Sequence, residues 1–270
     1  MSSQSFFSAL GYTANVLLLF AGLYVYVSLI RQISARQTAA PEELPKRFGL
    51  PEAIIAAFLM SLLLLNVAVG ASAPAAELNT KDLVANLVVT VMVVLILVGF
   101  LTLRGFHLDA LAGFSKLGIV RAVGTGALLL LAAYPLIVFA DLMTRHFIGN
   151  GSARQNIVEL FNGSHTMPQR VMIIVLAVAV APVAEEFVFR FFLYGVLRRY
   201  LGRFVGLIVN ALLFAAVHQH LPSFGPLFIL GGCFTLAYEW SGSLLVPMTM
   251  HSLFNSLSLL FLAFPDISQQ

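Results

Sequence analysis

The apolar residues of this 270-residue chain are gathered into runs of about 18 to 25 residues, which short polar stretches separate. An α-helix needs ~20 apolar residues to cross ~30 Å of hydrocarbon. The strands of a transmembrane β-barrel would alternate over ~10 residues, whereas VVTVMVVLILV and IIVLAVAVA do not alternate. Charged residues make up only 10% of the chain, against ~25% in a typical globular protein. The sequence therefore predicts an all-α, polytopic membrane protein and excludes a water-soluble fold.

Apolar runs and helix breakers predict eight crossings, over residues 11–31, 51–70, 82–103, 118–144, 169–200, 204–220, 224–240 and 243–263. The fifth of these helices is too long for one straight span. It contains Pro182, which lacks a backbone N–H and is expected to kink or break the helix near its middle. Irregular backbone at membrane depth occurs where it is buried in protein or lines a cavity, so this helix is a candidate functional element.

The distribution of basic residues predicts the orientation of the chain, because cytoplasmic loops carry an excess of Lys and Arg. With the N-terminus outside, ten Lys and Arg residues fall on the cytoplasmic side and four on the outer side. Residues 32–50 are then expected to be a cytoplasmic loop. The 145–170 connection is expected outside, and its two Asn-Gly-Ser triplets, at Asn150 and Asn162, are either glycosylation sequons or turns. The ten cytoplasmic residues are Arg31, Arg36, Lys46, Arg47, Arg104, Lys116, Arg121, Arg198, Arg199 and Arg203, and the outer four are Lys81, Arg145, Arg154 and Arg170.

Three charged residues interrupt the apolar part of the fifth helix: Glu185, Glu186 and Arg190. A charge at the bilayer centre costs ~2.5–3.5 kcal/mol on insertion scales, so these side chains must pair or face a wet cavity. Glu186 and Arg190 are four residues apart on one helix face, which predicts an ion pair. Glu185 is rotated by ~100° from Glu186 and lies outside that pair. A buried network that only locks helices together would explain Glu186 and Arg190 as well as a catalytic role does.

Two further polar clusters follow in the last three helices. His218 and His220 end the sixth helix, and His251 and Asn255 share one face of the eighth. A carboxylate near imidazoles can act as a general base toward water, while His or Asn donors can stabilise an oxyanion. This set fits hydrolysis of an acyl bond without a covalent intermediate. Five earlier residues at loops or helix ends are expected to be solvated: His107, Asp109, Asp141, His146 and His165.

Other chemistries have less support in the sequence. No serine lies in a G-x-S-x-G turn, and the one cysteine, Cys233, excludes an intrachain disulfide and a Cys-ligated zinc or iron–sulfur site. The H-E-x-x-H motif of zinc proteases is absent, although two glutamates and two histidines from separate helices could still ligate a metal. No basic tract with interleaved aromatic residues indicates nucleic-acid binding.

The polar residues match three motifs in order: E-E-x-x-x-R from Glu185, F-x-x-x-H at Phe214 and His218, and H-x-x-x-N at His251 and Asn255. This set resembles the CPBP family, the CAAX proteases and bacteriocin-processing enzymes, also called the ABI family, which includes the Ras-converting CAAX prenyl protease. The resemblance covers residues 168–262 and implies an intramembrane glutamic endopeptidase. It divides the chain into N-terminal helices and loops, 1–167, and a catalytic core, 168–263, that holds the last four helices.

The resemblance also implies a role for each matching residue. Glu185 would activate water, His218 would orient it or move its proton, and His251 with Asn255 would form the oxyanion site. Glu186, Arg190 and Phe214 would support these groups, without a metal or other cofactor. One departure is Phe191, which stands where many members have Gly and is expected to narrow the cavity.

The resemblance implies a membrane-associated peptide or protein substrate, with a lipidated CAAX-type tail as one option, and contact with membrane lipids. A non-proteolytic scaffold or bacteriocin self-immunity protein of the same family is the alternative, and a proton-coupled transporter using Glu185 and His218 is a third. The end of the chain, PDISQQ, has no organelle-retrieval motif, which favours a prokaryotic plasma membrane.

The depths of two site residues conflict if the helices are straight and upright. Counted from expected helix ends, His218 would lie ~20 Å from the inner surface and Glu185 only ~8 Å from it. We therefore expect residues 198–208 to lie along the interface, so that the sixth helix starts later.

Overall fold

The computed structural model describes residues 3–38, 48–72, 80–114, 116–148 and 166–263, and within these ranges it contains helices and no strand. The helices before the 149–165 connection are α1 (Ser3–Thr38), α2 (Leu50–Ser72), α3 (Thr80–Leu103), α4 (Leu108–Ala112) and α5 (Ile119–Ile148). One long helix follows, composed of α7 (Met167–Val175), η1 (Leu176–Val180), α8 (Ala181–Glu186), η2 (Phe187–Leu193) and α9 (Tyr194–Leu201). The last helices are α10 (Arg203–Val217), the short η3 (Leu221–Ser223), α11 (Phe224–Ser241) and α12 (Leu245–Ala263).

The predicted fold class is confirmed, because each of the eight predicted helices is present in the part of the chain that the structure describes. Six helical stretches are long and apolar enough to cross a membrane, and α10 and α12 are shorter apolar helices. One boundary was wrong: α1 continues to Thr38, so residues 32–38 are helical and do not belong to a loop. The predictions for Asn150, Asn162 and His165 lie outside the described residues.

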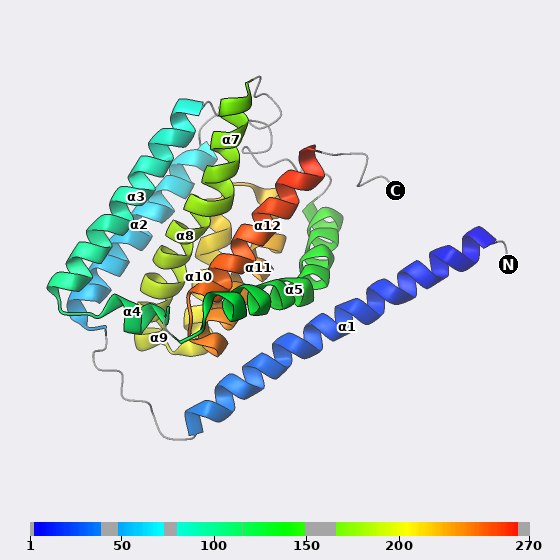
Figure 1. Cartoon of the computed structure of the whole chain (residues 1–270), viewed down its shortest axis with the longest axis horizontal. Coiled ribbons are helices and arrows are strands. Elements are labelled where there is room, and N and C mark those ends of the chain that lie inside the picture. Colours follow the sequence, from blue (N-terminus) through cyan, green and yellow to red (C-terminus); the bar gives the residue numbers. More distant parts are fainter. Residues whose placement is uncertain (1–2, 39–47, 73–79, 115, 149–165, 264–270) are drawn as a thin grey trace.

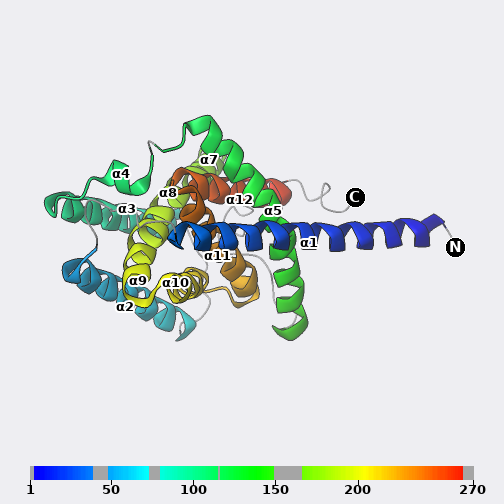
Figure 2. The same ribbon diagram turned by 90° about the horizontal axis from the view of Figure 1, so that it is seen from below.

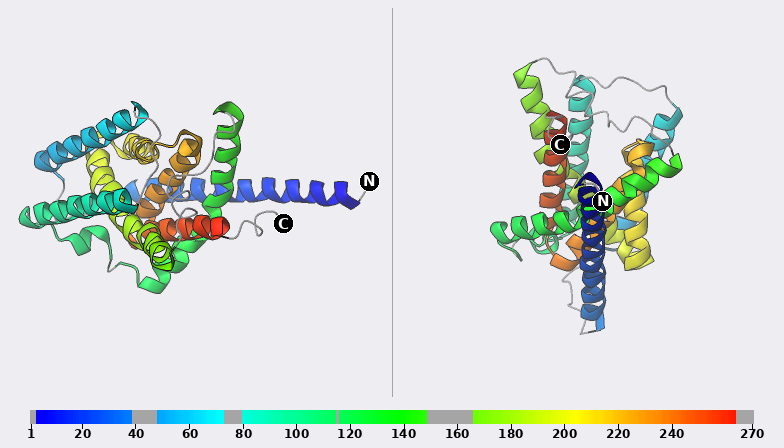
Figure 3. Two further views of the ribbon diagram at one scale, coloured as in Figure 1. Left: turned by 90° about the horizontal axis from the view of Figure 1, so that it is seen from above. Right: turned by 90° about the vertical axis from the view of Figure 1, so that its right-hand side faces the viewer.

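The helices from α7 to α12 pack against one another, and α1, α2, α3 and α5 lie around them (Figure 1). α10 packs along α11, and α5 packs along α11 and α12. α1 contacts α5 and α11 near its C-terminal end, and its N-terminal end projects alone beyond the other helices (Figure 3). α2 packs on α10, and α3 packs on α8, at the end of the molecule opposite to that projection (Figure 2).

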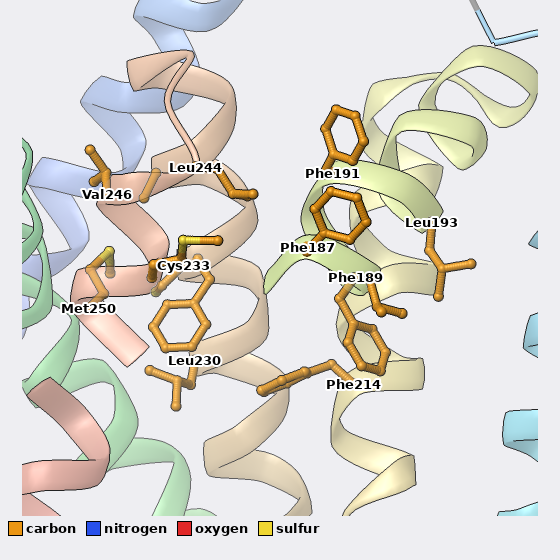
Figure 4. Close-up of a cluster of buried hydrophobic side chains, with 14 of the residues drawn as sticks. Phe187, Phe189, Phe191, Leu193, Phe214, Leu230, Cys233, Leu244, Val246 and Met250 are labelled. Carbon is orange, nitrogen blue, oxygen red and sulfur yellow. The ribbon is translucent and has the colours of Figure 1, made fainter. Parts of the chain in front are cut away.

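The packed core lies where η2, α10, α11 and α12 meet. All seven residues of η2 are buried, from Phe187 to Leu193. Figure 4 shows Phe214 of α10 between the phenylalanines of η2 and Leu230 of α11. Such all-round burial is unusual for a helix that also faces lipid, and it surrounds the charged residue Arg190 within the same segment.

Candidate active site

The helix that carries Glu185 and Glu186 runs without interruption from Met167 to Leu201, but its hydrogen bonding switches from α-helical to π-helical and back twice along its length. α8 ends at Glu186 and lies between the π-helical segments η1 and η2. In a π-helix each N–H bonds five residues back, and such segments are frequent at functional sites. The backbone stays in the right-handed helical region on both sides of α8. The helix is therefore not broken near Pro182 but is widened into π-helical turns on both sides of α8.

Asn255 connects α12 to the irregular part of this helix. In η1 the N–H of Ala181 donates to the carbonyl of Leu176. With the same spacing, the donor to the Ala177 carbonyl would be residue 182, which is a proline and has no N–H. The Asn255 side chain takes that place, because its Nδ2 donates to the Ala177 carbonyl at 2.7 Å. One N–H of the amide is thus used for helix packing, and the oxyanion role of Asn255 stays a prediction.

Glu186 contacts both Arg190 and His251 inside the bundle, so that the three side chains form a buried polar network. Arg190 Nε lies 3.1 Å from Glu186 Oε2, and both side chains have no solvent exposure, which confirms the ion pair predicted from their spacing. His251 Nδ1 lies 2.8 Å from the other oxygen of the same carboxylate, Oε1. A buried charge is stabilised by a charged partner and by hydrogen bonds: Oε1 of Glu186 is hydrogen-bonded to His251, and Oε2 lies in ion-pair contact with Arg190 without forming a hydrogen bond.

Aromatic rings enclose the guanidinium of Arg190. Its central carbon lies 4.2 Å from the ring centre of Phe214, 5.1 Å from that of Phe234 and 5.8 Å from that of Phe189. The negative faces of these rings attract a cation when water is excluded. Phe214 therefore packs directly on the guanidinium, and the supporting role that the resemblance implies for it stays a prediction. Phe191, the residue that departs from the family pattern, is buried against the rings of Phe187 and of Phe48, which precedes α2.

Glu185 occupies a different environment from its neighbour in the sequence. Its side chain is 28% exposed, and its ion-pair contact is with His251 Nε2 at 3.9 Å. That distance exceeds a direct hydrogen bond. Packing therefore gives the two adjacent carboxylates different surroundings: both oxygens of Glu186 contact protein groups, while Glu185 is partly exposed beside His251.

His218 caps the C-terminal end of α10 and is half-buried. Its Nδ1 lies 2.7 Å from the carbonyl oxygen of Phe214. Because a carbonyl only accepts hydrogen bonds, Nδ1 carries the proton and Nε2 is left as an acceptor in the neutral ring. The carboxylate of Glu185 lies close enough for its charge to act on His218. The ring of Phe214 meets both imidazoles edge-on, at centroid distances of 4.9 Å from His218 and 5.8 Å from His251.

The conflict between the depths of Glu185 and His218 disappears in the structure, and the proposed interfacial segment was wrong. α9 ends at Leu201, Gly202 has a φ of +79°, and α10 starts at once at Arg203 and folds back along α9. Glu185 lies 17 residues before this turn and His218 lies 16 residues after it, so both reach the same height. The earlier count failed because it began at a membrane surface, whereas the long helix is 35 residues in length.

Several polar contacts of the bundle have no counterpart in the sequence motifs. Glu239, 4% exposed, accepts hydrogen bonds from the Tyr194 hydroxyl at 3.0 Å and from Arg198 at 2.7 Å, and pairs with Arg203 at 2.7 Å. Glu52 of α2 is also fully buried and pairs with Arg104 at 2.9 Å. The only available signal was the position of each glutamate next to a long apolar run, which does not identify the partner.

Metal ligation was left open by the sequence. Among the residues that the structure describes, no three His, Cys, Asp or Glu side chains converge as a ligand set. Glu185 and His251 approach each other, while both oxygens of Glu186 are engaged with Arg190 and His251.

Of the five polar residues expected to be solvated, Asp141 is partly exposed and pairs with Arg145 at 2.8 Å, one turn along α5.

Comparison with known proteins relates this region to a protease family. Residues 167–257 match the family model described as type II CAAX prenyl endopeptidase Rce1-like. The membrane-embedded CAAX protease MroQ of Staphylococcus aureus (strain USA300) is 26% identical over 121 residues, which cover 39% of this chain and 49% of that protein. The match therefore spans about half the length of the curated relative. No solved structure matches the chain.

Proposed function

We propose, on the premise that residues 167–257 belong to the CAAX protease family, that this chain is an intramembrane endopeptidase. It would hydrolyse a peptide bond of a membrane-associated protein with a water molecule activated by Glu185. The observation that carries the proposal is the different treatment of two adjacent carboxylates. Glu186 is fully buried and bound to Arg190 and His251, whereas Glu185 is 28% exposed beside an imidazole. A general base must be reachable by the water whose proton it accepts.

The residues around Glu185 suggest how the reaction would proceed. Glu185 accepts a proton from water, and the resulting hydroxide attacks the carbonyl carbon of the scissile peptide bond. The Nε2 lone pair of His218 helps to hold that water. When the C–N bond breaks, Glu185 returns the proton to the departing amine, so that the carboxylate is regenerated. No covalent intermediate forms and no metal is required.

His251 would stabilise the oxyanion that forms on the attacked carbonyl oxygen. Its Nδ1 is engaged with Glu186 at 2.8 Å, so Nε2 can donate a hydrogen bond only from the protonated ring. The remaining N–H of Asn255 is the further donor that we assign to this oxyanion site. Such an oxyanion site would explain why the buried Glu186–Arg190 ion pair contacts His251.

The substrate that we propose is a membrane-anchored protein with a prenylated CAAX-type tail. The family description names CAAX prenyl endopeptidases, and a lipidated tail would bring its peptide to a site enclosed by membrane helices. Cleavage would release a tripeptide from the C-terminus. We also propose that the protein lies in the plasma membrane of a prokaryote, with its N-terminus outside and its site open toward the cytoplasm; the distribution of Lys and Arg among the loops supports this orientation.

The test of this function compares wild type with Glu185→Gln in lipid nanodiscs, using a prenylated CAAX peptide and mass spectrometry of the released tripeptide. Loss of the base is expected to lower kcat by ~1,000-fold, while the melting temperature stays near that of wild type. Addition of EDTA to wild type is expected to leave kcat unchanged. Activity of Glu185→Gln would overturn the role of the base, and loss of activity with EDTA, restored by zinc, would identify a metalloprotease instead. An inactive wild type favours the scaffold alternative.

The orientation is tested separately by cysteine labelling in intact cells, in a Cys233→Ser background. Labels at residue 40 or 201 are expected to be protected from a membrane-impermeant reagent, and a label at residue 155 is expected to react. The opposite pattern would place the N-terminus inside and turn the site toward the outer leaflet.

A further inference from the structure

Gln219, the residue after His218, has a strained backbone. Its φ is +51°, and in the part of the chain described by the structure it is the one non-glycine residue with a positive φ. The Cβ of a non-glycine residue disfavours this left-handed conformation, because it comes close to the following carbonyl oxygen, so the conformation persists only where surrounding contacts hold it. The strain separates two histidines: His218 turns back to the Phe214 carbonyl, while His220 Nδ1 lies 2.8 Å from Ser223 Oγ on η3.

The contacts that hold Gln219 come from α2, in the half of the chain without a motif. Gln219 Nε2 donates to Asn66 Oδ1 at 2.6 Å and to the Asn66 carbonyl at 3.3 Å. Gly70, one turn further along α2, lies so close to the Gln219 side chain that a Cβ at residue 70 would collide with its amide. Asn66 and Gly70 share one helix face, and together they form a notch that fits this amide.

The setting of Asn66 argues against an incidental contact. Asn66 lies within the apolar span Leu50–Gly70, where lipid cannot supply a hydrogen bond, so a polar side chain is satisfied by another helix. The bond holds Gln219, the second residue beyond α10 and the residue directly after His218.

We propose that Asn66, Gly70 and Gln219 are positioning residues, a clamp by which α2 holds His218 at the working distance from Glu185. This proposal rests on the proposed function. Release of Gln219 would let its backbone leave the positive-φ region and would free the end of α10. A displacement of ~1 Å in a group that orients a reactant can lower the rate by ~100-fold, whereas substrate binding elsewhere would be unaffected.

Two measurements on the full-length chain in lipid nanodiscs test the clamp. The first is the kcat and KM of Asn66→Ala and of Gly70→Ala with the prenylated CAAX peptide. We expect kcat to fall by ~10- to 100-fold in both variants, with KM within about twofold of wild type. The matched control is Ser61→Ala on the same helix. The Ser61 hydroxyl is exposed and donates to the Ala57 carbonyl one turn earlier, so its removal should change neither kcat nor KM.

The second measurement does not depend on turnover. Diethylpyrocarbonate modifies accessible imidazoles, and mass spectrometry reports the rate at each histidine, with exposed His107 as the internal reference. His218 is expected to react at least about threefold faster in Asn66→Ala and Gly70→Ala than in wild type, because local opening exposes it. Unchanged reactivity of His218 overturns the clamp, whatever the activity. Unchanged kcat in an active protein overturns it as well. If wild type cleaves nothing but His218 reactivity rises in both variants, the proposed function fails and the clamp stands.

Discussion

The first three helices and the last four bury different kinds of side chain. In the apolar windows of α1, α2 and α3, 17%, 6% and 11% of the residues are buried, against 33% in the long α7–α9 helix and 39% in α11. Apolar side chains such as Phe58, Leu65 and Ile96 point outward, as expected of helices that face lipid. The second half uses its greater burial to enclose Glu186 and Arg190. The comparison shows that lipid can cover apolar helices, but only protein can enclose charge.

Each half nevertheless contains a fully buried glutamate in an ion pair. Arg190, the partner of Glu186, has no exposure, whereas Arg104, the partner of Glu52, is 41% exposed. Removing one member of a fully enclosed pair strands the other charge, while an exposed partner can be solvated again. The effect of breaking each ion pair therefore reports how completely each half of the molecule shields a charge from solvent.

The largest effect is expected at the enclosed pair. Arg190→Ala or Glu186→Gln should lower the free energy of unfolding by ~3–5 kcal/mol, because one buried charge is left unpaired. The double variant Glu186→Gln with Arg190→Gln should recover part of this loss. The measurement is denaturant unfolding in mixed micelles, alongside kcat. Equal stability of the single and double variants would show that the charges are not coupled.

A smaller effect is expected at Glu52 in the first half. Its carboxylate accepts hydrogen bonds from the Gly49 N–H at 2.6 Å and from Arg104 at 2.9 Å. Glu52→Ala should lower the free energy of unfolding by ~2 kcal/mol, since bonds to a charged acceptor are lost but Arg104 stays solvated. The kcat of the folded fraction should match wild type. A loss as large as that of Arg190→Ala would remove the contrast between the halves.

Asn255 tests the link between α12 and the widened helix. Asn255→Ala leaves the Ala177 carbonyl without its donor and should cost ~1 kcal/mol of stability. Pro182→Ala restores a backbone N–H at the position that would reach that carbonyl. The double variant Pro182→Ala with Asn255→Ala should therefore be more stable than Asn255→Ala in a thermal melt. No recovery would mean that Pro182 does not create the need for Asn255.

The smallest effect is expected at the partly exposed pair on α5. Asp141 and Arg145 have side-chain exposures of 32% and 50%, and such pairs contribute ~0–1 kcal/mol. Asp141→Asn should therefore shift the melting temperature by no more than about 2 °C, with no change in kcat. A loss comparable to that of Glu52→Ala would show that this face of α5 is more enclosed than its exposure indicates.

The sequence was sufficient to identify the helices and an ion pair within one helix, although α1 continues beyond its predicted end. Runs of apolar residues identified the eight helices, because the length of an apolar run decides whether it can cross hydrocarbon. The Glu186–Arg190 pair was also predicted correctly, since residues four apart lie on one face of any α-helix. The polar site residues Glu185, His218, His251 and Asn255 were also identified from short motifs. All four lie within residues 167–257, which the family model matches.

The contacts between distant helices followed only from their packing. No spacing along the chain indicates that His251 binds Glu186, that Asn255 reaches the Ala177 carbonyl, or that Gln219 is held from α2. These pairs are separated by 65, 78 and 153 residues. Their partners depend on the turn at Gly202 and on which helix faces meet. The physical reason is that helix periodicity fixes which side chains share a face, whereas the rotation and height of each helix are set by the whole packed bundle.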